Sequence, residues 1–226
     1  MLRLVLFDID GTLIHTDGAG IKAFGRAFEM QFKIPNGTQG MKFSGRTDTG
    51  LARELFTRHA VETSRENFQA FFDCYFDWLA HMLTEVRGDV FPGVWRLIYD
   101  LQSLPTPPTL GLLTGNLRLG AELKLRHFNV WDFFQFGAFS DEHENRNEIA
   151  RAAHDRGSRL AGRPLRGEEI LVIGDTPLDI ECGRAIGAKV LAVATGGSTL
   201  AELESHRPTW AVTNLEKVRA REICLR

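Results

Sequence analysis

The sequence predicts an α/β protein in which a parallel sheet carries helices on both faces and a helical cap is inserted into the chain. Short apolar runs typical of buried strands alternate with longer segments of helical periodicity. Asp8 and Thr114 directly follow two of these runs, and Asp175 follows another after a single glycine. Between the first and second runs lies a long region whose pattern is helical only.

The expected core strands are apolar runs of three to five residues. Because they alternate with helical segments, they favour a parallel sheet covered on both sides. Their ranges are Leu4–Phe7, Thr109–Leu113, Ile170–Ile173, Val190–Ala194 and Trp210–Val212, with a further short strand within Gln135–Phe139.

The inserted region extends from about residue 18 to residue 86. Its aromatic and aliphatic residues recur at helical spacing, which favours the core of a small bundle over a cofactor site. The segment DVFPGV at residues 89–94 then returns the chain to the sheet. We predict a core domain formed by residues 1–16 and 88–226 and a helical cap formed by residues 17–87.

Composition excludes several function classes. The 226 residues carry a formal net charge of -2 without long runs of either sign, so no nucleic acid or anionic membrane is expected as a partner. No run reaches the roughly 18 apolar residues of a membrane span, and the N-terminal residues do not resemble a secretory signal. Three scattered cysteines suggest neither a disulfide framework nor a zinc site, which favours the reducing cytoplasm.

The segment LVLFDIDGT at residues 4–12 is the most informative. Side chains alternate along a strand, so Asp8 and Asp10 point the same way at the end of a buried run. Two buried carboxylates without a partner lose hydration at a cost of several kcal/mol. Since Mg²⁺ prefers such oxygen ligands, the pair suggests a metal site in which one carboxylate can also attack.

Three motifs give a family resemblance. The segment DIDGT at residues 8–12, the segment LGLLTGN at residues 110–116 and the segment ILVIGDTPLD at residues 170–179 resemble, in order, the first, second and fourth motifs of the haloacid dehalogenase-like phosphohydrolases. The resemblance spans nearly the whole chain. It implies a Rossmann-like parallel sheet core with helices on both faces and an inserted α-helical cap of the C1 type.

The resemblance also implies roles. Asp8 corresponds to the nucleophile and Asp10 to the residue that protonates the leaving oxygen, while its carbonyl binds the metal. Asp8, Asp10, Asp175 and Asp179 would together hold Mg²⁺. From the residues alone, Asp179 is equally explained as an acidic residue in the first turn of a helix that starts at Thr176 and Pro177.

Candidate phosphate ligands follow the second motif. The hydroxyl of Thr114 and the N–H groups of Gly115 and Asn116 precede a predicted helix at Leu117–His127, where phosphate oxygens bind readily. Asn116 is alternatively the N-cap of that helix.

The third motif of the family is a basic residue, usually Lys, between the second and fourth motifs. Arg146 is the candidate here, although Arg is not a neutral substitute for Lys. Lys124 and Lys189 are the alternatives, and both are predicted to lie on the surface.

Other residues are weaker candidates. In the segment FSGRTD at residues 43–48, Arg46 either contacts the substrate or belongs to a plain loop-to-helix turn. His15 either faces the cleft or is solvated. The segment GGS at residues 196–198 lacks the spacing of a dinucleotide fingerprint, so no cofactor other than Mg²⁺ is expected.

These residues predict an enzyme, a Mg²⁺-dependent phosphatase that hydrolyses a small phosphorylated metabolite through an aspartyl-phosphate and resembles phosphoglycolate phosphatases. One alternative is a phosphotransferase similar to β-phosphoglucomutase. That mutase carries a His at the position of Gly20, which weakens this alternative. The other is a non-catalytic binding protein on the same scaffold. The substrate and oligomeric state are not predicted.

Overall fold

The computed structural model describes residues 1–224 and has a six-stranded parallel sheet at its centre, in the order β5-β4-β1-β6-β7-β8. The strand β1 (Leu4–Phe7) lies between β4 (Thr109–Leu113) and β6 (Ile170–Gly174). All of their residues except Thr109 are buried, which explains the continuous apolar runs. The outer strands are β5 (Phe136–Ala138), β7 (Lys189–Val193) and β8 (Trp210–Val212).

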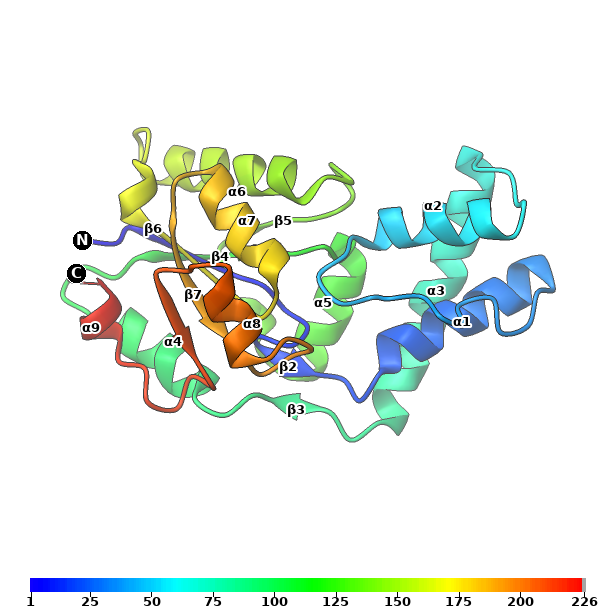
Figure 1. The fold of residues 1–226 in the computed structure, drawn as a ribbon, viewed down its shortest axis with the longest axis horizontal. Coiled ribbons are helices and arrows are strands. Elements are labelled where there is room, and N and C mark those ends of the chain that lie inside the picture. The colour runs from blue at the N-terminus through cyan, green and yellow to red at the C-terminus, as the bar shows by residue number, and fades with distance from the viewer. Residues whose placement is uncertain (225–226) are drawn as a thin grey trace.

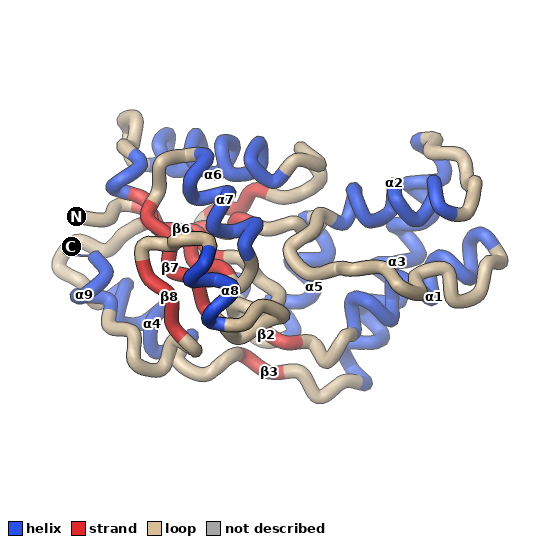
Figure 2. The backbone as a smooth tube through the Cα atoms, in the orientation of Figure 1, coloured by secondary structure: helices blue, strands red, loops and turns tan. Residues whose placement is uncertain are grey.

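Helices cover both faces of the sheet (Figure 2). Val5 and Phe7 pack with helices α4, α5 and α9, whereas Leu4 and Leu6 pack with α6, α7 and α8, because side chains alternate along β1. The bounds are α4 (Val94–Gln102), α5 (Arg118–His127), α6 (Arg146–Leu160), α7 (Pro177–Ala185), α8 (Leu200–Ser205) and α9 (Ala220–Cys224), with short 3-10 helices at Trp131–Phe133 and Gly167–Glu169.

Three helices form the cap, at the end of the molecule opposite both termini (Figure 1). The side chains of Thr47 and Ser64 accept backbone N–H groups at the starts of α2 and α3, which fixes where these helices begin. Phenylalanines from all three helices fill a separate apolar cluster, and α5 packs against α3. The bounds are α1 (Ala19–Phe32), α2 (Asp48–Arg58) and α3 (Arg65–Glu85).

The chain leaves and re-enters the core through two adjacent strands. β2 (Ile14–His15) pairs antiparallel with β3 (Asp89–Val90). The approach is tight, since a Cβ at Gly88 would lie 2.5 Å from the carbonyl oxygen of His15. Sequence analysis missed this pair because two-residue strands have no measurable periodicity.

The structure confirms the predicted fold class, with a parallel sheet, helices on both faces and an inserted helical cap. Strand ends differ by about one residue: the predicted Val190–Ala194 is Lys189–Val193, and β5 occupies only Phe136–Ala138 of the predicted run. None of the described helices is long and apolar enough to cross a membrane.

Candidate active site

Three neighbouring strands end at one edge of the sheet and place Asp8, Thr114 and Asp175 there. Each residue directly follows its strand, β1, β4 or β6. The N–H of Asp8 donates to the carbonyl of Ile173 at 2.9 Å, and that of Thr114 donates to Ala138 at 3.2 Å. The sheet therefore fixes the backbone from which these buried side chains extend.

A buried acidic cluster lies at this edge. Asp8, Asp175 and Asp179 each offer a carboxylate oxygen, and these oxygens lie within 4.8 Å of one another. Burial raises the pKa of Asp8 to about 7, and the charge of Asp179 adds to the effect. Burial likewise raises the pKa of Asp175 well above its usual range, with repulsion from Asp179 and Asp8. The cluster is therefore short of positive charge.

Two glycines and the hydroxyl of Thr12 lie against the carboxylate of Asp175. The hydroxyl of Thr12 donates to Asp175 Oδ1 at 3.1 Å. A Cβ at Gly11 would lie 2.4 Å from Asp175 Oδ2, and one at Gly196 would lie 1.7 Å from it. Gly11 also has φ +89°, a conformation that favours glycine. Both glycines are therefore needed for the observed position of the carboxylate.

Arg146 brings a buried positive charge to the cluster. It is the first residue of α6, where the side chain of Asn145 caps the helix. Its Nη2 lies 3.7 Å from Asp8 Oδ1 and also contacts Asp179. Its Nη1 donates to the carbonyl of Gly45 in the cap at 3.0 Å. Burial alone lowers the pKa of Arg146, but the carboxylates of Asp179 and Asp8 outweigh burial and raise this pKa above its usual range.

Asp179 has donors on both carboxylate oxygens. Oδ2 accepts the N–H of Thr176 at 3.0 Å and its hydroxyl at 2.7 Å, as part of a capping box at the start of α7. Oδ1 accepts from Arg146. The predicted helix start, with Thr176 as N-cap and Pro177 as first residue, is confirmed. Asp179 thus fixes both the helix and the guanidinium.

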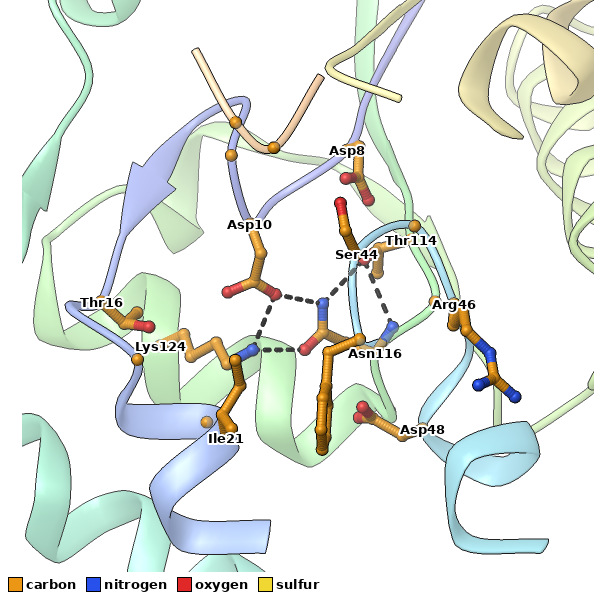
Figure 3. Close-up of a pocket in the computed structure, with 18 of the residues that line it drawn as sticks. Asp8, Asp10, Thr16, Ile21, Ser44, Arg46, Asp48, Thr114, Asn116 and Lys124 are labelled. Carbon is orange, nitrogen blue, oxygen red and sulfur yellow. Dashed lines mark hydrogen bonds and ion pairs between the residues drawn. The ribbon is translucent and has the colours of Figure 1, made fainter. Parts of the chain in front are cut away.

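Lys124 lies in the site, so its prediction as a surface residue is wrong. Its ammonium donates to Asp10 Oδ2 and to Asn116 Oδ1, both at 2.7 Å (Figure 3). Only 4 % of Lys124 is exposed. The signal was present in the sequence: on a helix, Lys124 shares a face with Ala121 and Leu125, which are buried.

Asn116 joins the second motif to Asp10. Its Nδ2 donates to Thr114 Oγ1 at 2.9 Å and to Asp10 Oδ2 at 2.8 Å. The alternative prediction of Asn116 as an N-cap is wrong. The helix α5 begins at Arg118 rather than at the predicted Leu117, so Leu117 is its N-cap. The N–H of Leu117 donates instead to Asp48 Oδ2 of the cap at 2.8 Å.

The cap loop at residues 43–48 rests directly on the core. The N–H of Asp48 donates to the carbonyl oxygen of Gly115 at 2.8 Å, and the hydroxyl of Thr47 donates to the carbonyl oxygen of Glu144 at 3.0 Å. A Cβ at Gly115 would lie 2.2 Å from the carbonyl oxygen of Arg46. Gly115 therefore permits the close contact between cap and core in addition to any contact with a ligand.

A cavity of about 450 Å³ lies between cap and core. The core contributes the acidic and basic groups described above, and the cap contributes α1, the loop at residues 43–48 and Tyr75 of α3. His15 and Gly197 also line it. The polar strand ends thus face a partly open cavity that is large enough for a small molecule.

The model of the haloacid dehalogenase-like hydrolases matches residues 5–193, which includes every strand end of the site. The chain belongs to this family. The match also covers the cap residues and Arg146.

Relatives of this hydrolase differ in the reactions for which they are named. It is 26% identical over 190 residues to a bifunctional riboflavin kinase/FMN phosphatase of Arabidopsis thaliana, a match covering 84% of this chain and 48% of that protein. The chain thus spans about half of that relative. It is 24% identical over 221 residues to a putative pyrophosphatase, PpaX, of Clostridium perfringens, covering 94% and 93% of the two chains.

A solved structure shares the fold. The structure of a β-phosphoglucomutase from Clostridium difficile is similar with a TM-score of 0.74 and 17% identity, over 99% of this chain and 96% of that one. At this identity the likeness concerns the fold alone.

The side chain of Arg46 turns out of the cavity, although the residue lines it. Its Nη1 donates to Glu54 Oε2 of α2 at 2.5 Å, and the side chain points away from Asp10 (Figure 3). Sequence analysis could not foresee this, since the pairing of Arg46 with Glu54 depends on how the cap loop turns into α2. Contact of Arg46 with a substrate stays a prediction.

The donor set fits a divalent metal ion. Asp8 and Asp175 present buried carboxylate oxygens, the hard ligands that Mg²⁺ prefers. Burial and neighbouring carboxylates raise the pKa of both residues, and the positive charge of Arg146 offsets this only in part. A cation bound between them would supply further positive charge.

Proposed function

We propose that this hydrolase is a Mg²⁺-dependent phosphatase that cleaves a small-molecule phosphate monoester through an aspartyl-phosphate on Asp8. The observation that carries the proposal is the surroundings of Asp8: a buried carboxylate in an acidic cluster, with the guanidinium of Arg146 at 3.7 Å. A nucleophile, a fixed positive charge and a potential metal site thus meet at one end of the cavity.

The proposed reaction has two steps. A carboxylate oxygen of Asp8 attacks phosphorus, the bond from phosphorus to the alcohol oxygen breaks, and Asp10 gives that oxygen a proton. Asp10 then takes a proton from a water molecule, whose oxygen attacks phosphorus and releases phosphate from Asp8. Asp10 lines the cavity, as both transfers require.

We propose that Asp8, Asp175 and the backbone carbonyl of Asp10 hold Mg²⁺. The ion would neutralise charge so that one anion can approach another. Because both oxygens of Asp179 already have donors, this residue would act on the site through Arg146 rather than as a direct ligand.

The phosphoryl group would be bound by Arg146 and by the hydroxyl of Thr114, which lies at the end of β4 beside Asn116. The N–H of Gly115 is a further candidate donor. That of Asn116 already donates to Thr114 Oγ1 at 3.3 Å, so we expect it to contribute less.

We propose that residues 17–87 act as the cap domain over a core of residues 1–16 and 88–226. The paired strands β2 and β3 lie at these boundaries, and the cap helices supply most of a separate apolar cluster. Such a cap would exclude water and polymeric substrates while enclosing a small ester.

The partner we propose is a small phosphorylated metabolite in the cytoplasm, supported by the size of the cavity and by three unpaired cysteines. One relative is named an FMN phosphatase and another a putative pyrophosphatase, so esters and anhydrides must be compared directly. The mutase alternative would return the phosphoryl group to a sugar phosphate rather than to water.

The test is phosphate release from a panel containing 4-nitrophenyl phosphate, sugar phosphates, phosphoglycolate and pyrophosphate, with Mg²⁺ or with EDTA. We expect release from monoesters that requires Mg²⁺ and disappears in Asp8→Asn. The matched control is Asp132→Asn, an exposed carboxylate whose loss should change nothing. Turnover by Asp8→Asn near the parent rate would refute the assignment of Asp8 as the nucleophile. Isomerisation of glucose phosphates without phosphate release would replace the proposal with a mutase.

A further inference from the structure

Lys124 has a buried ammonium group on the side of Asp10, not of Asp8. Its Nζ lies 2.7 Å from Asp10 Oδ2 and 2.7 Å from Asn116 Oδ1, and 5 % of its side chain is exposed. Figure 3 shows the ammonium directed at Asp10 while Asp8 lies apart from it. The acidic cluster has Arg146 as its own cation, so Lys124 serves a different carboxylate.

The position of Lys124 is rigid. Its neighbours Ala121 and Leu125 on α5 are buried. The cap helix α1 covers the side chain of Lys124, since a Cβ at Gly20 would lie 3.5 Å from Lys124 Nζ. The hydroxyl of Tyr75 is also close, at 3.8 Å from the same Cβ position. An ammonium held here without partners would be strongly destabilising, so its two hydrogen bonds are required for it to be buried at all.

Asp10 is held from two sides by this arrangement. The same oxygen, Oδ2, accepts from Lys124 and from Asn116 Nδ2 at 2.8 Å, and Lys124 and Asn116 are hydrogen-bonded to each other. Without these donors the carboxylate, whose side chain is 42% exposed, would be free to change rotamer. The three side chains form a closed triangle that fixes the direction of Asp10.

We propose that Lys124 is a positioning residue that holds Asp10 so that its other carboxylate oxygen faces the leaving-group oxygen of a phosphate attacked by Asp8. This inference rests on the proposed function. The proton passes from Asp10 to the leaving oxygen as the bond to phosphorus breaks. The ammonium of Lys124 is hydrogen-bonded to Asp10 and Asn116 rather than to Asp8, and in the proposed role it acts only through Asp10.

This role predicts a dependence on the leaving group. Benzyl phosphate releases an alkoxide that needs the proton of Asp10, whereas 4-nitrophenyl phosphate releases a phenolate that leaves without one. The two esters are similar in size. The ratio kcat/KM covers only the steps up to departure of the alcohol, so the later attack of water does not enter the comparison.

The experiment measures kcat/KM of Lys124→Met for both esters. We expect a loss on the order of a hundredfold for benzyl phosphate and less than about fivefold for 4-nitrophenyl phosphate. Lys189→Met, which removes a partly exposed lysine of β7, is the control and should match the parent for both esters. In an Asp10→Asn background, Lys124→Met should add little further loss for benzyl phosphate, since both changes act on one step.

Equal losses on the two esters, or additive losses in the double variant, would overturn the inference while leaving the phosphatase intact. If the parent hydrolyses neither ester nor any other member of the phosphate panel, the proposed function fails and this inference with it. Lys124→Gln serves if the Met variant does not fold. Its amide still donates a hydrogen bond, so we expect the same preference with a smaller loss, and equal losses would again refute the role.

Discussion

The guanidinium of Arg146 lies 3.7 Å from the carboxylate of Asp8 while it also contacts Asp179. Asp8 follows the end of β1, Asp179 lies in the first turn of α7, and Arg146 is the first residue of α6. Since an Arg remains protonated and can bind oxygens through two nitrogens, it can balance Asp8 and a phosphoryl group at once. The guanidinium of Arg146, our candidate for the third motif, is thus held in place by Asp179.

We predict that Arg146→Ala lowers kcat on the order of a hundredfold or more, because a fixed charge beside the reacting group is removed. Arg146→Lys should retain part of the activity, as charge remains while the two-nitrogen geometry is lost. Initial rates at saturating 4-nitrophenyl phosphate give kcat for the two variants and the parent.

The matched control for this prediction is Arg151→Ala on the same helix, where an exposed guanidinium pairs with Glu148. It should keep parent activity. The Tm of both variants should also be measured, because loss of Arg146 leaves buried carboxylates unpaired and can lower stability. Activity of folded Arg146→Ala within about threefold of the parent would contradict the role.

The fold was predictable because its signals are local. Apolar runs such as Leu4–Phe7 are buried on both faces, and helical periodicity in the insertion marks the residues that form most of the apolar cluster of the cap. The pair β2 and β3 escaped prediction since it depends on contact between residues 14–15 and 89–90, which no short window contains.

The candidate site was predictable where residues directly follow strands, as Asp8 and Asp175 do. It was not predictable where a partner comes from elsewhere in the chain. Lys124 pairs with Asp10 across 114 positions, and Arg46 is drawn to Glu54 by the turn of the cap loop. Predicting such pairings requires the tertiary structure, although the buried face of α5 already indicated that Lys124 is buried.

We predict that Mg²⁺ stabilises the protein more at pH 8 than at pH 5. The pKa of Asp8 is raised from 3.8 to about 7, so the folded state holds a proton that the unfolded state releases. Stability from this group is complete below pH 3.8 and is lost as pH rises through about 7. Mg²⁺ binds the ionised form and should restore stability where it was lost.

Thermal unfolding in EDTA and in Mg²⁺ at both pH values measures this effect. The Mg²⁺-dependent rise in Tm should shrink in Asp8→Asn, which also removes much of the decrease with pH. A rise in Tm of the parent that is equal at the two pH values, or larger at pH 5, would show that the carboxylate cluster does not bind the ion.

We predict that Gly196→Ala weakens Mg²⁺ binding. The new Cβ would lie 1.7 Å from Asp175 Oδ2, so the carboxylate must move. The Mg²⁺ concentration for half-maximal activity should rise about tenfold, since displaced ligands and their supports typically cost 10–100-fold in affinity. Gly120→Ala is the control, as its Cβ would make only ordinary contacts at 3.6 Å or more. Unchanged Mg²⁺ dependence in Gly196→Ala would remove Asp175 from the metal site.

The final prediction concerns Arg46 and separates a substrate ligand from a structural residue of the cap. Arg46 and Glu54 are each about one-third exposed, so their ion pair contributes at most about 1 kcal/mol and is easily exchanged for a contact with substrate. We expect Arg46→Ala to raise KM about tenfold with little change in kcat, as loss of one charge-assisted hydrogen bond implies.

Arg58→Ala is the matched comparison, because Arg58 binds the other oxygen of Glu54 at 3.0 Å and does not line the cavity. If the role of Arg46 were only to neutralise Glu54, the two variants would behave alike. Steady-state kinetics of both variants with the best substrate of the panel decides between these roles. A KM raised in Arg46→Ala and unchanged in Arg58→Ala requires the guanidinium of Arg46 to turn from α2 into the cavity when substrate binds.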